Sequence, residues 1–207
     1  MTFDEIRQAV EARFPGAVTS ATTGGPEPWA LVRVGDWERV AQHLRDDPAL
    51  AMDCLMCLSG LDTGAPDGDL AVVYHLYSLR HRHRFAAHVQ TPRAKPLVPT
   101  VSHLWGTANW HEREAYDMYG VRFENHPDMT RILCPEDWEG WPLRKDYQVQ
   151  DFYHDIPVPY RALPEEHWGG TVVETRRDQG PPGTFRSVRG SSKEPREPAS
   201  TAEESAS

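Results

Sequence analysis

One stretch decides how this chain folds: PTVSHLWGTANWHEREAYDMYG, residues 99–120. Its apolar residues recur every three to four positions, so they would line one side of a helix. These residues are Val101, Leu104, Trp105, Ala108, Ala115 and Met118. Pro99 precedes the stripe, and Gly120 stands where a left-handed residue commonly ends a helix. The pattern predicts a long helix over Thr100–Tyr119, with its stripe packed against a core.

Upstream of this helix, helical and strand patterns alternate. Apolar residues at helical spacing predict a helix over Phe3–Phe14, which Pro15-Gly16 would end. A second helix over Trp37–Leu44 would be capped by Asp36, whose side chain can accept a backbone N–H. Strands are predicted over Trp29–Val34, within the apolar run Leu50–Leu61, and as a pair over Leu70–Ser78 and Phe85–Val89. These elements predict a domain built of sheet and helices.

Downstream of Gly120 the periodicity dissolves. Prolines at positions 127, 135, 142, 157 and 159 interrupt an aromatic-rich stretch, which therefore cannot be one long helix. We expect Val121–Tyr160 to lie extended across a surface. From about Glu174 the composition changes to Gly, Pro, Ser, Arg and Glu, with little apolar surface to bury. The sequence therefore predicts a folded part over residues 1–173 and a disordered tail over residues 174–207.

Composition argues against several classes of function. The 207 residues carry 31 acidic and 22 basic side chains, for a formal net charge of −9 at pH 7. Binding of nucleic acid or of an anionic membrane surface relies on Lys and Arg, so this balance argues against both. No run of ~18 apolar residues occurs, so no transmembrane helix is predicted. Met1–Phe14 lacks the apolar core of a signal peptide, and we expect the chain to stay in the cytoplasm.

Cys54 and Cys57 spell a C-x-x-C motif inside an apolar run. On a regular strand, residues three apart face opposite sides, so the two thiols are expected to diverge. Cys134 is the only other cysteine, which leaves too few for a four-cysteine metal or iron–sulfur site. We therefore interpret the cysteines as small buried hydrophobes.

Histidines offer the other route to a metal site. Four of them lie close together in sequence: His75, His81, His83 and His88. No carboxylate or cysteine follows them at a familiar ligand spacing, which favours a solvated basic loop over a metal centre. His111-Glu112 begins an H-E-x-x-H zinc motif, but Ala115 stands in place of the second histidine. A stand-alone metal hydrolase that uses these histidines is therefore only a remote alternative.

Acidic residues crowd the last turns of the long helix. Glu112, Glu114 and Asp117 oppose the helix dipole there, so something should compensate them. They form either a solvated face or a set of anchors, for a basic partner or for the chain's own Arg131, Arg144 and Lys145. Because Glu114 and Asp117 lie three residues apart, they could share one arginine. No phosphate loop, nucleophile elbow or dinucleotide fingerprint occurs, so no catalytic group is predicted.

Two motifs in this part of the chain resemble one known family. The first runs Glu112-Arg-Glu-Ala-Tyr-Asp-Met-Tyr-Gly-Val121 and continues with His126-Pro-Asp-Met129 and Arg131-Ile-Leu133. The second comprises Pro135-Glu-Asp-Trp-Glu-Gly140 and Pro142-Leu-Arg-Lys-Asp-Tyr147. Both are similar to the C-type subunit of the type-1 NADH:quinone oxidoreductase, the bacterial respiratory complex I. The close match covers about Leu70–Tyr160. Departures from the family pattern are Asn125, Cys134 and Trp141.

The resemblance implies an α+β fold: a two-layer domain with a mixed β-sheet and packed helices, followed by an extended C-terminal arm. It implies a non-catalytic subunit in the peripheral arm of the complex, on the cytoplasmic side of the inner membrane. The partners would be the quinone-site large subunit of the D type and the B-type subunit that holds the terminal iron–sulfur cluster. FMN, iron–sulfur clusters, NADH and quinone would bind to other subunits, and this chain would carry no cofactor.

The resemblance also implies which residues form the fold and the interface. They are the positions that match the family motifs: Glu112, Arg113, Glu114, Asp117, His126, Pro127, Asp128, Arg131, Glu136, Asp137, Trp138, Arg144, Lys145, Asp146 and Tyr147. None of them is predicted to be catalytic. The whole complex would couple electron transfer from NADH to quinone with proton translocation, while this chain holds the electron-carrying subunits in register. The equivalent subunit of a membrane-bound hydrogenase, or of a complex with another donor, is the alternative that these motifs leave open.

Overall fold

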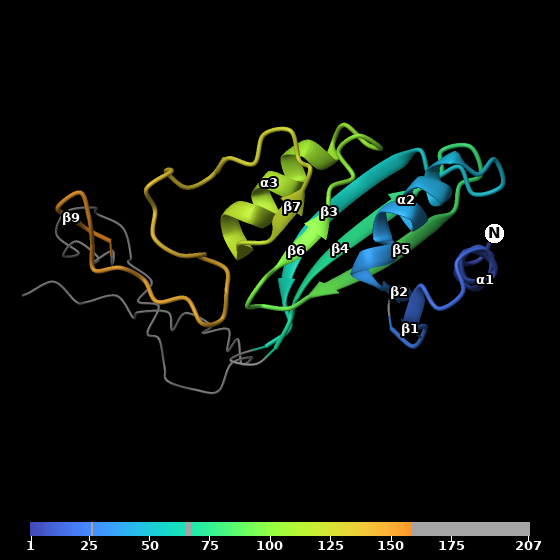
Figure 1. Ribbon diagram of the computed structural model, residues 1–207, viewed down its shortest axis with the longest axis horizontal. Helices are drawn as coiled ribbons and strands as arrows, with labels where there is room; N and C mark the ends of the chain where they lie inside the picture. The colour runs from blue at the N-terminus through green and yellow to red at the C-terminus, as the bar shows by residue number, and fades with distance from the viewer. Residues whose placement is uncertain (26, 65–67, 159–207) are drawn as a thin grey trace, which may run out of the picture. The chain divides into compact units, whose positions relative to one another are not determined.

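The computed structural model describes residues 1–25, 27–64 and 68–158 (Figure 1). The predicted boundary at residues 173 and 174, and the tail beyond it, lie outside these residues. The helices are α1 (Phe3–Arg13), α2 (Trp37–Asp46) and α3 (Ala108–Tyr119), with a short 3-10 turn η1 (Val34–Asp36) before α2. The strands are β1 (Val18–Thr22), β2 (Trp29–Val32), β3 (Cys54–Asp62), β4 (Leu70–Tyr77), β5 (Arg84–Thr91), β6 (Leu97–Pro99), β7 (Arg122–Glu124), β8 (Phe152–Tyr153) and β9 (Ile156–Pro157).

Five strands form a mixed sheet in the order β1-β2-β5-β4-β3. β2 runs parallel to β5, whereas the other neighbouring strands are antiparallel. β4 and β5 pair along their whole length, from Leu70 opposite Thr91 to Tyr77 opposite Arg84. The predicted strand pair is therefore confirmed, although its linker contains neither Gly nor Asn.

The hydrophobic core lies between the helices and one face of the sheet. Every second residue of β4 belongs to this core: Leu70, Val72, Tyr74 and Leu76. In Figure 1, α2 lies over the central strands. Its buried Trp37 ring packs on Tyr74, with the ring centroids 4.3 Å apart. α1 adds Ile6 and Val10. Helices on one face of a mixed sheet make the two-layer α+β fold, and that prediction is confirmed.

The long helix is shorter than predicted, because α3 begins at Ala108 and not at Thr100. Residues 101–105 make a separate turn, in which the N–H groups of Leu104 and Trp105 both donate to the carbonyl of Val101. The Trp105 indole donates to the carbonyl of Met52 at 2.9 Å, which fixes this turn against the start of β3. Side-chain contacts with distant segments thus override the helical pattern. Gly120 adopts a φ of 72° at the C-terminus, so the predicted left-handed end is confirmed.

The prediction that the Cys54 and Cys57 thiols diverge is wrong, because β3 contains a bulge at Met56. Cys54 pairs with Tyr77, whereas Cys57 pairs with His75. These partners are two residues apart on β4 and therefore share a face, which places both cysteines on one face as well. A bulge inserts one extra residue into a strand and shifts its side chains accordingly. Both cysteines are half-buried on the face away from the core.

Asp36 does not cap α2, contrary to the sequence prediction. It ends the 3-10 turn η1 with helical backbone angles, φ −103° and ψ −11°, and its side chain makes no capping hydrogen bond. An N-cap residue needs extended backbone to turn its side chain toward the first free N–H groups. The Asp36 carboxylate instead pairs with Arg39 at 2.5 Å.

The arm after α3 is mostly irregular, as its prolines predict. β7 adds a short parallel pairing with β6, from Leu97 opposite Arg122 to Pro99 opposite Glu124. Residues 125–151 then form neither helix nor strand. The described chain ends in the small hairpin of β8 and β9. A segment with so little regular structure needs other contacts to hold it, and its signature side chains provide them.

Candidate functional site

Asp117 anchors the arm to the last turn of α3. Its carboxylate is fully buried and accepts four hydrogen bonds from the arm. Arg131 donates to Oδ1 at 2.8 Å, and the backbone N–H groups of Ile132, Leu133 and Cys134 donate to Oδ2 at 2.9, 2.6 and 2.9 Å. Burial alone would raise the pKa of Asp117, but these N–H groups and the guanidinium outweigh it and hold the pKa below its usual value. The carboxylate is therefore ionised and paired.

Arg131 carries the connection further along the arm. Its Nη2 donates to the carbonyls of Trp138 and Gly140, at 3.1 and 2.9 Å. Its guanidinium also lies over the Trp141 ring, 4.6 Å from the centroid. Because the fork of a guanidinium donates in several fixed directions, one arginine joins the first signature motif to the second.

A second anchor fastens the arm to the sheet. Asp62, at the end of β3, accepts hydrogen bonds from the Arg93 guanidinium and from the N–H of Lys145 at 2.8 Å. Arg93 also bonds the Asp146 carboxylate at 3.1 Å. Burial would raise the pKa of Asp62, but Arg93 and the backbone donors lower it overall. The second signature motif is thus held by a carboxylate more than eighty positions earlier in the chain.

Gly120, which follows α3, is packed tightly against side chains of the arm. A Cβ atom there would lie 2.5 Å from the Trp141 ring and 2.6 Å from the Arg144 guanidinium. Arg144 donates through Nε to the carbonyl of Tyr119 at 2.6 Å, and the N–H of Leu143 donates to Met118. Glycine is required here both by the positive φ and by the space that the arm occupies.

Glu112 is buried without a cationic partner among the described residues. Its side chain is fully buried, and its carboxylate accepts from the Thr100 hydroxyl and from the Val101 N–H at 2.7 Å. Burial raises the pKa of Glu112 to about 7, although these two donors act to lower it. His126 Nε2 lies 3.8 Å from the carboxylate, but it faces the Asn109 carbonyl at 3.2 Å while Nδ1 accepts the Asp128 N–H. That pattern assigns the Nε2–H tautomer of a neutral imidazole.

Glu112→Gln is expected to weaken the pH dependence of stability. The pKa of Glu112 in the folded chain is about 7, above the ordinary 4.5, so folding favours its protonated form. The stability from this proton is fully present below about pH 4.5 and is lost as the pH rises through about 7. Between about pH 5 and pH 8 the loss amounts to roughly 2–3 kcal/mol. Across that pH range, the melting temperature should fall less for Glu112→Gln than for wild type or for the control Glu114→Gln. Parallel curves would contradict this expectation.

The other predicted signature residues fall into two groups. Arg113 donates to Thr130 through Nε and Nη2, at 3.2 and 2.9 Å, so it too ties the arm to α3. Asp137 accepts from Tyr153 and His154 at 2.8 and 2.7 Å, and the Trp138 indole donates to the Tyr147 hydroxyl at 3.1 Å. The exposed positions are Pro127, Asp128, Glu136, Lys145 and Asp146. Glu114 is exposed as well, and within the described residues it shares neither Arg131 nor Arg144.

Sequence reasoning missed three parts of this arrangement. Asp62 and Arg93 lie outside both motifs, and no local pattern indicates that they pair. The hairpin of β8 and β9 was also missed, because its turn residues are His154 and Asp155, not Gly or Asn. Both adopt positive φ, 48° and 64°. Asp and His tolerate this conformation better than most residues, and that was the only available signal.

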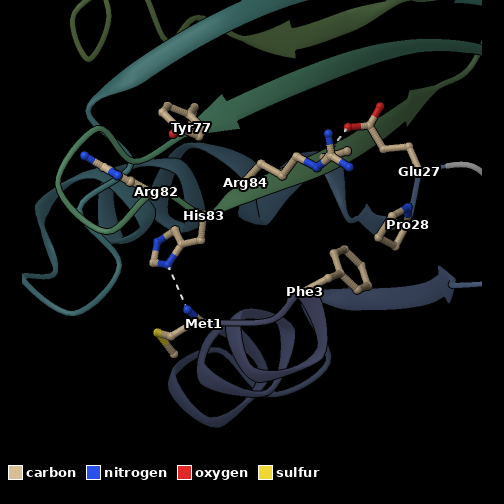
Figure 2. A pocket seen from close by; sticks show the side chains of 9 residues that line it. Met1, Phe3, Glu27, Pro28, Tyr77, Arg82, His83 and Arg84 are labelled. Atoms are coloured by element: carbon tan, nitrogen blue, oxygen red, sulfur yellow. Dashed lines mark hydrogen bonds and ion pairs between the residues drawn. The ribbon is translucent and has the colours of Figure 1, made fainter.

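The four histidines considered as metal ligands are engaged separately. His81 and His83 bond the backbone carbonyls of Pro48 and Leu50 at 2.8 and 2.7 Å. His75 faces Glu27, and His88 stacks on Trp29 with centroids 4.2 Å apart. His83 is buried and not solvated. It lines a cavity of about 460 Å³, where Figure 2 shows it beside Met1. Among the described residues, no three His, Cys, Asp or Glu side chains are placed to hold a metal ion.

The fastened arm exposes apolar side chains. Five large ones are at least 47% exposed: Leu133, Leu143, Val149, Phe152 and Ile156. Half of the exposed large hydrophobic residues in the described chain therefore lie on this one segment. None of the described helices is long and apolar enough to cross a membrane. An apolar surface on a segment held by buried ion pairs is typical of a protein–protein contact.

Comparison with known proteins agrees with the signature. The family model of the respiratory-chain NADH dehydrogenase 30 kDa subunit matches residues 30–153. The C subunit of NADH-quinone oxidoreductase from Chloroherpeton thalassium is 47% identical over 155 residues, which cover 74% of this chain but 64% of that protein. The C subunit from Chlorobium phaeobacteroides is 44% identical over 164 residues, which cover 75% of this chain and 98% of that protein.

Two solved structures share this fold. A trypsin-resistant fragment of Nqo5 is 30% identical, with a TM-score of 0.51, and the match covers 62% of this chain and 99% of the fragment. A chain of an archaeal membrane-bound sulfane sulfur reductase matches with a TM-score of 0.57 over 70% of this chain and 85% of its own length. At 21% identity, that second likeness shows the fold alone. The signature motifs, the mixed sheet and the family match agree, and the chain belongs to the family of the 30 kDa subunit of respiratory-chain NADH dehydrogenase, which includes the C subunit of NADH-quinone oxidoreductase.

Proposed function

We propose that this chain is a cofactor-free docking subunit of a NADH:quinone oxidoreductase. The observation that carries the proposal is the arm at residues 121–158. Buried carboxylates fasten it to the domain at Asp117 and Asp62, while its apolar side chains stay exposed. Such a surface is already ordered before binding, so less conformational entropy is lost on association.

In this proposal the chain keeps the electron-carrying subunits at fixed distances. Its partners are the D-type quinone-site subunit and the B-type subunit with the terminal iron–sulfur cluster. The complex would lie on the cytoplasmic side of the inner membrane, where it couples NADH oxidation by quinone to proton translocation. FMN, the iron–sulfur clusters, NADH and quinone belong to the other subunits. The isolated chain would have no activity.

The signature residues then have two roles. Asp117, Arg131, Arg144 and Glu112 shape the arm and the turn before α3, because their polar groups are used inside the chain. Exposed positions such as Glu136 remain available to a partner. This division explains why one short stretch of sequence carries so many charged residues without forming a catalytic site.

Affinity purification through a tag on the full chain tests this function. The quinone-site and iron–sulfur subunits are expected to co-purify in fixed proportion with the flavin and NADH-binding subunits. A nickel-binding large subunit in their place would support the hydrogenase-type alternative. The purified chain alone should show no flavin or iron–sulfur absorbance and no NADH oxidation. A stoichiometric chromophore that survives gel filtration would overturn the proposal.

A further inference from the structure

The hairpin of β8 and β9 is a built structure and not a loose end. Its two turn residues, His154 and Asp155, both have positive φ, which is the backbone of a type I′ turn. The Tyr153 hydroxyl and His154 Nε2 both bond Asp137, and the Tyr153 ring lies 5.3 Å from the Trp138 ring. Polar and aromatic contacts therefore hold the hairpin onto the second signature motif.

This hairpin displays its apolar side chains outward. Phe152 and Ile156 are each 64% exposed, among the highest values for large hydrophobic residues in the described chain. Tyr153 and Ile156 form one cross-strand pair, whereas Phe152 belongs to the other. The two side chains therefore project from opposite faces of the hairpin. A partner that covers both must surround the hairpin, as a socket does.

The surroundings of these side chains are acidic. Residues 133–158 contain six acidic side chains, and all six residues are exposed: Glu136, Asp137, Glu139, Asp146, Asp151 and Asp155. The same segment has two basic residues. Arg144 is half-buried and donates to the Tyr119 carbonyl, so only Lys145 is an exposed cation there. Asp146 already pairs with Arg93, and Asp137 accepts from Tyr153 and His154. The other four carboxylates make no ion pair among the described residues, so a partner that covers the hairpin must meet their charge with Lys and Arg.

We infer that residues 151–158 are an anchor that inserts Phe152 and Ile156 into an apolar socket with a basic rim on a protein partner. This inference rests on the proposed docking function and adds which residues dock and what chemistry receives them. A second copy of this chain does not fit, because two acidic hairpins would repel each other. An anionic membrane surface is disfavoured for the same reason.

Purification of the complex through a tag on the full chain measures how much the anchor contributes to binding of the partner subunit. Phe152→Ser/Ile156→Ser is expected to reduce recovery of the partner subunit about tenfold or more, since exposed anchors in sockets dominate binding. Leu79→Ser, at a position 65% exposed in the loop between β4 and β5, is the matched apolar control. Glu139→Lys/Asp151→Lys is expected to reduce recovery of the partner subunit and to make that recovery less sensitive to salt. The control Asp4→Lys/Asp69→Lys, also at exposed positions, should change neither the recovery nor its sensitivity to salt.

A photo-crosslinking amino acid in place of Phe152 identifies the occupant. The expected product joins this position to a segment of another subunit that contains Lys or Arg beside apolar residues. If the hairpin variants recover as much of the partner subunit as wild type does, the inferred anchor is wrong but the proposed docking function stands. If wild type itself recovers no subunit, both fail. A crosslink to a second copy or to lipid would overturn the basic socket. Unchanged melting temperatures for the hairpin variants would establish that any loss arises from docking and not from unfolding.

Discussion

Asp117→Ala is expected to destabilise the folded chain by roughly 3–5 kcal/mol, because it leaves buried polar groups without a partner. The substitution strands the Arg131 guanidinium and the N–H groups of Ile132, Leu133 and Cys134, which all donate to this carboxylate. For a chain of this size, such a loss lowers the melting temperature by roughly 10 °C. Thermal melts of the purified chain near neutral pH measure it.

The charged neighbour on the same helix is the matched control. Glu114 is exposed and shares none of these donors within the described residues, so Glu114→Ala should cost less than about 1 kcal/mol. Arg131→Ala should also destabilise, and the double variant should cost less than the sum of the two single changes because they break one contact. If Asp117→Ala melts like wild type but fails to join the complex, Asp117 is an interface residue and the internal anchor is wrong.

The same anchor makes the chain sensitive to acid. The pKa of Asp117 is lowered in the folded chain, because its donors outweigh the effect of burial. The stability that the ionised carboxylate contributes is present above the ordinary pKa near 3.8 and is lost as the pH falls through the lower folded value. Asp117→Ala should therefore narrow the difference in stability between neutral and acidic pH.

Gly120→Ala is expected to cost roughly 2–4 kcal/mol and to loosen the arm. The residue has φ of 72°, which strains any side chain, and its Cβ would lie 2.5 Å from the Trp141 ring. Either the ring or the Arg144 guanidinium must move, and both belong to the arm. Besides a lower melting temperature, limited trypsin digestion should cleave faster after Arg144 and Lys145, because local opening exposes the backbone to the protease.

Gly106→Ala separates this effect from the general cost of replacing a glycine. A Cβ at Gly106 would meet no atom within 4 Å, so the change should alter stability by less than about 1 kcal/mol. Equal effects at the two positions would show that the arm does not pack against Gly120. Faster cleavage without a lower melting temperature would instead show that the arm opens independently of the core.

Local patterns were enough for much of the fold. The β4 and β5 pair and the first helix follow from apolar periodicity, which depends only on neighbouring residues. The prolines of the arm exclude a long helix there, because a proline ring blocks the interior of a helix. The family motifs are equally local, so contiguous residues alone carry the resemblance to the respiratory family. Local patterns did not predict where α3 begins, because a separate turn at residues 101–105 replaces the predicted start of this helix.

The roles of the charged residues could not be predicted from local patterns. Glu112, Glu114 and Asp117 lie on the same helix and look alike in sequence. In the structure, Glu112 is buried with its pKa raised, Glu114 is exposed, and Asp117 is buried in an ion pair. The difference lies in desolvation, which depends on which segment covers each carboxylate. The Cys54 and Cys57 prediction failed for a related reason, since a single bulged residue sets the face of every later side chain.

The sequence by itself determined the helix that ends at Gly120, the strand pair, the irregular arm and the family. These depend on side-chain periodicity, backbone restrictions at Pro and Gly, and contiguous motifs. Only the tertiary structure decided that Asp62 holds Lys145, that Asp117 receives the arm, and that Phe152 and Ile156 face outward. Each of these contacts joins segments distant in the chain or depends on what remains uncovered after folding. The physical reason is that burial and pairing are properties of the packed chain, and they fix the energy of a charged or apolar side chain.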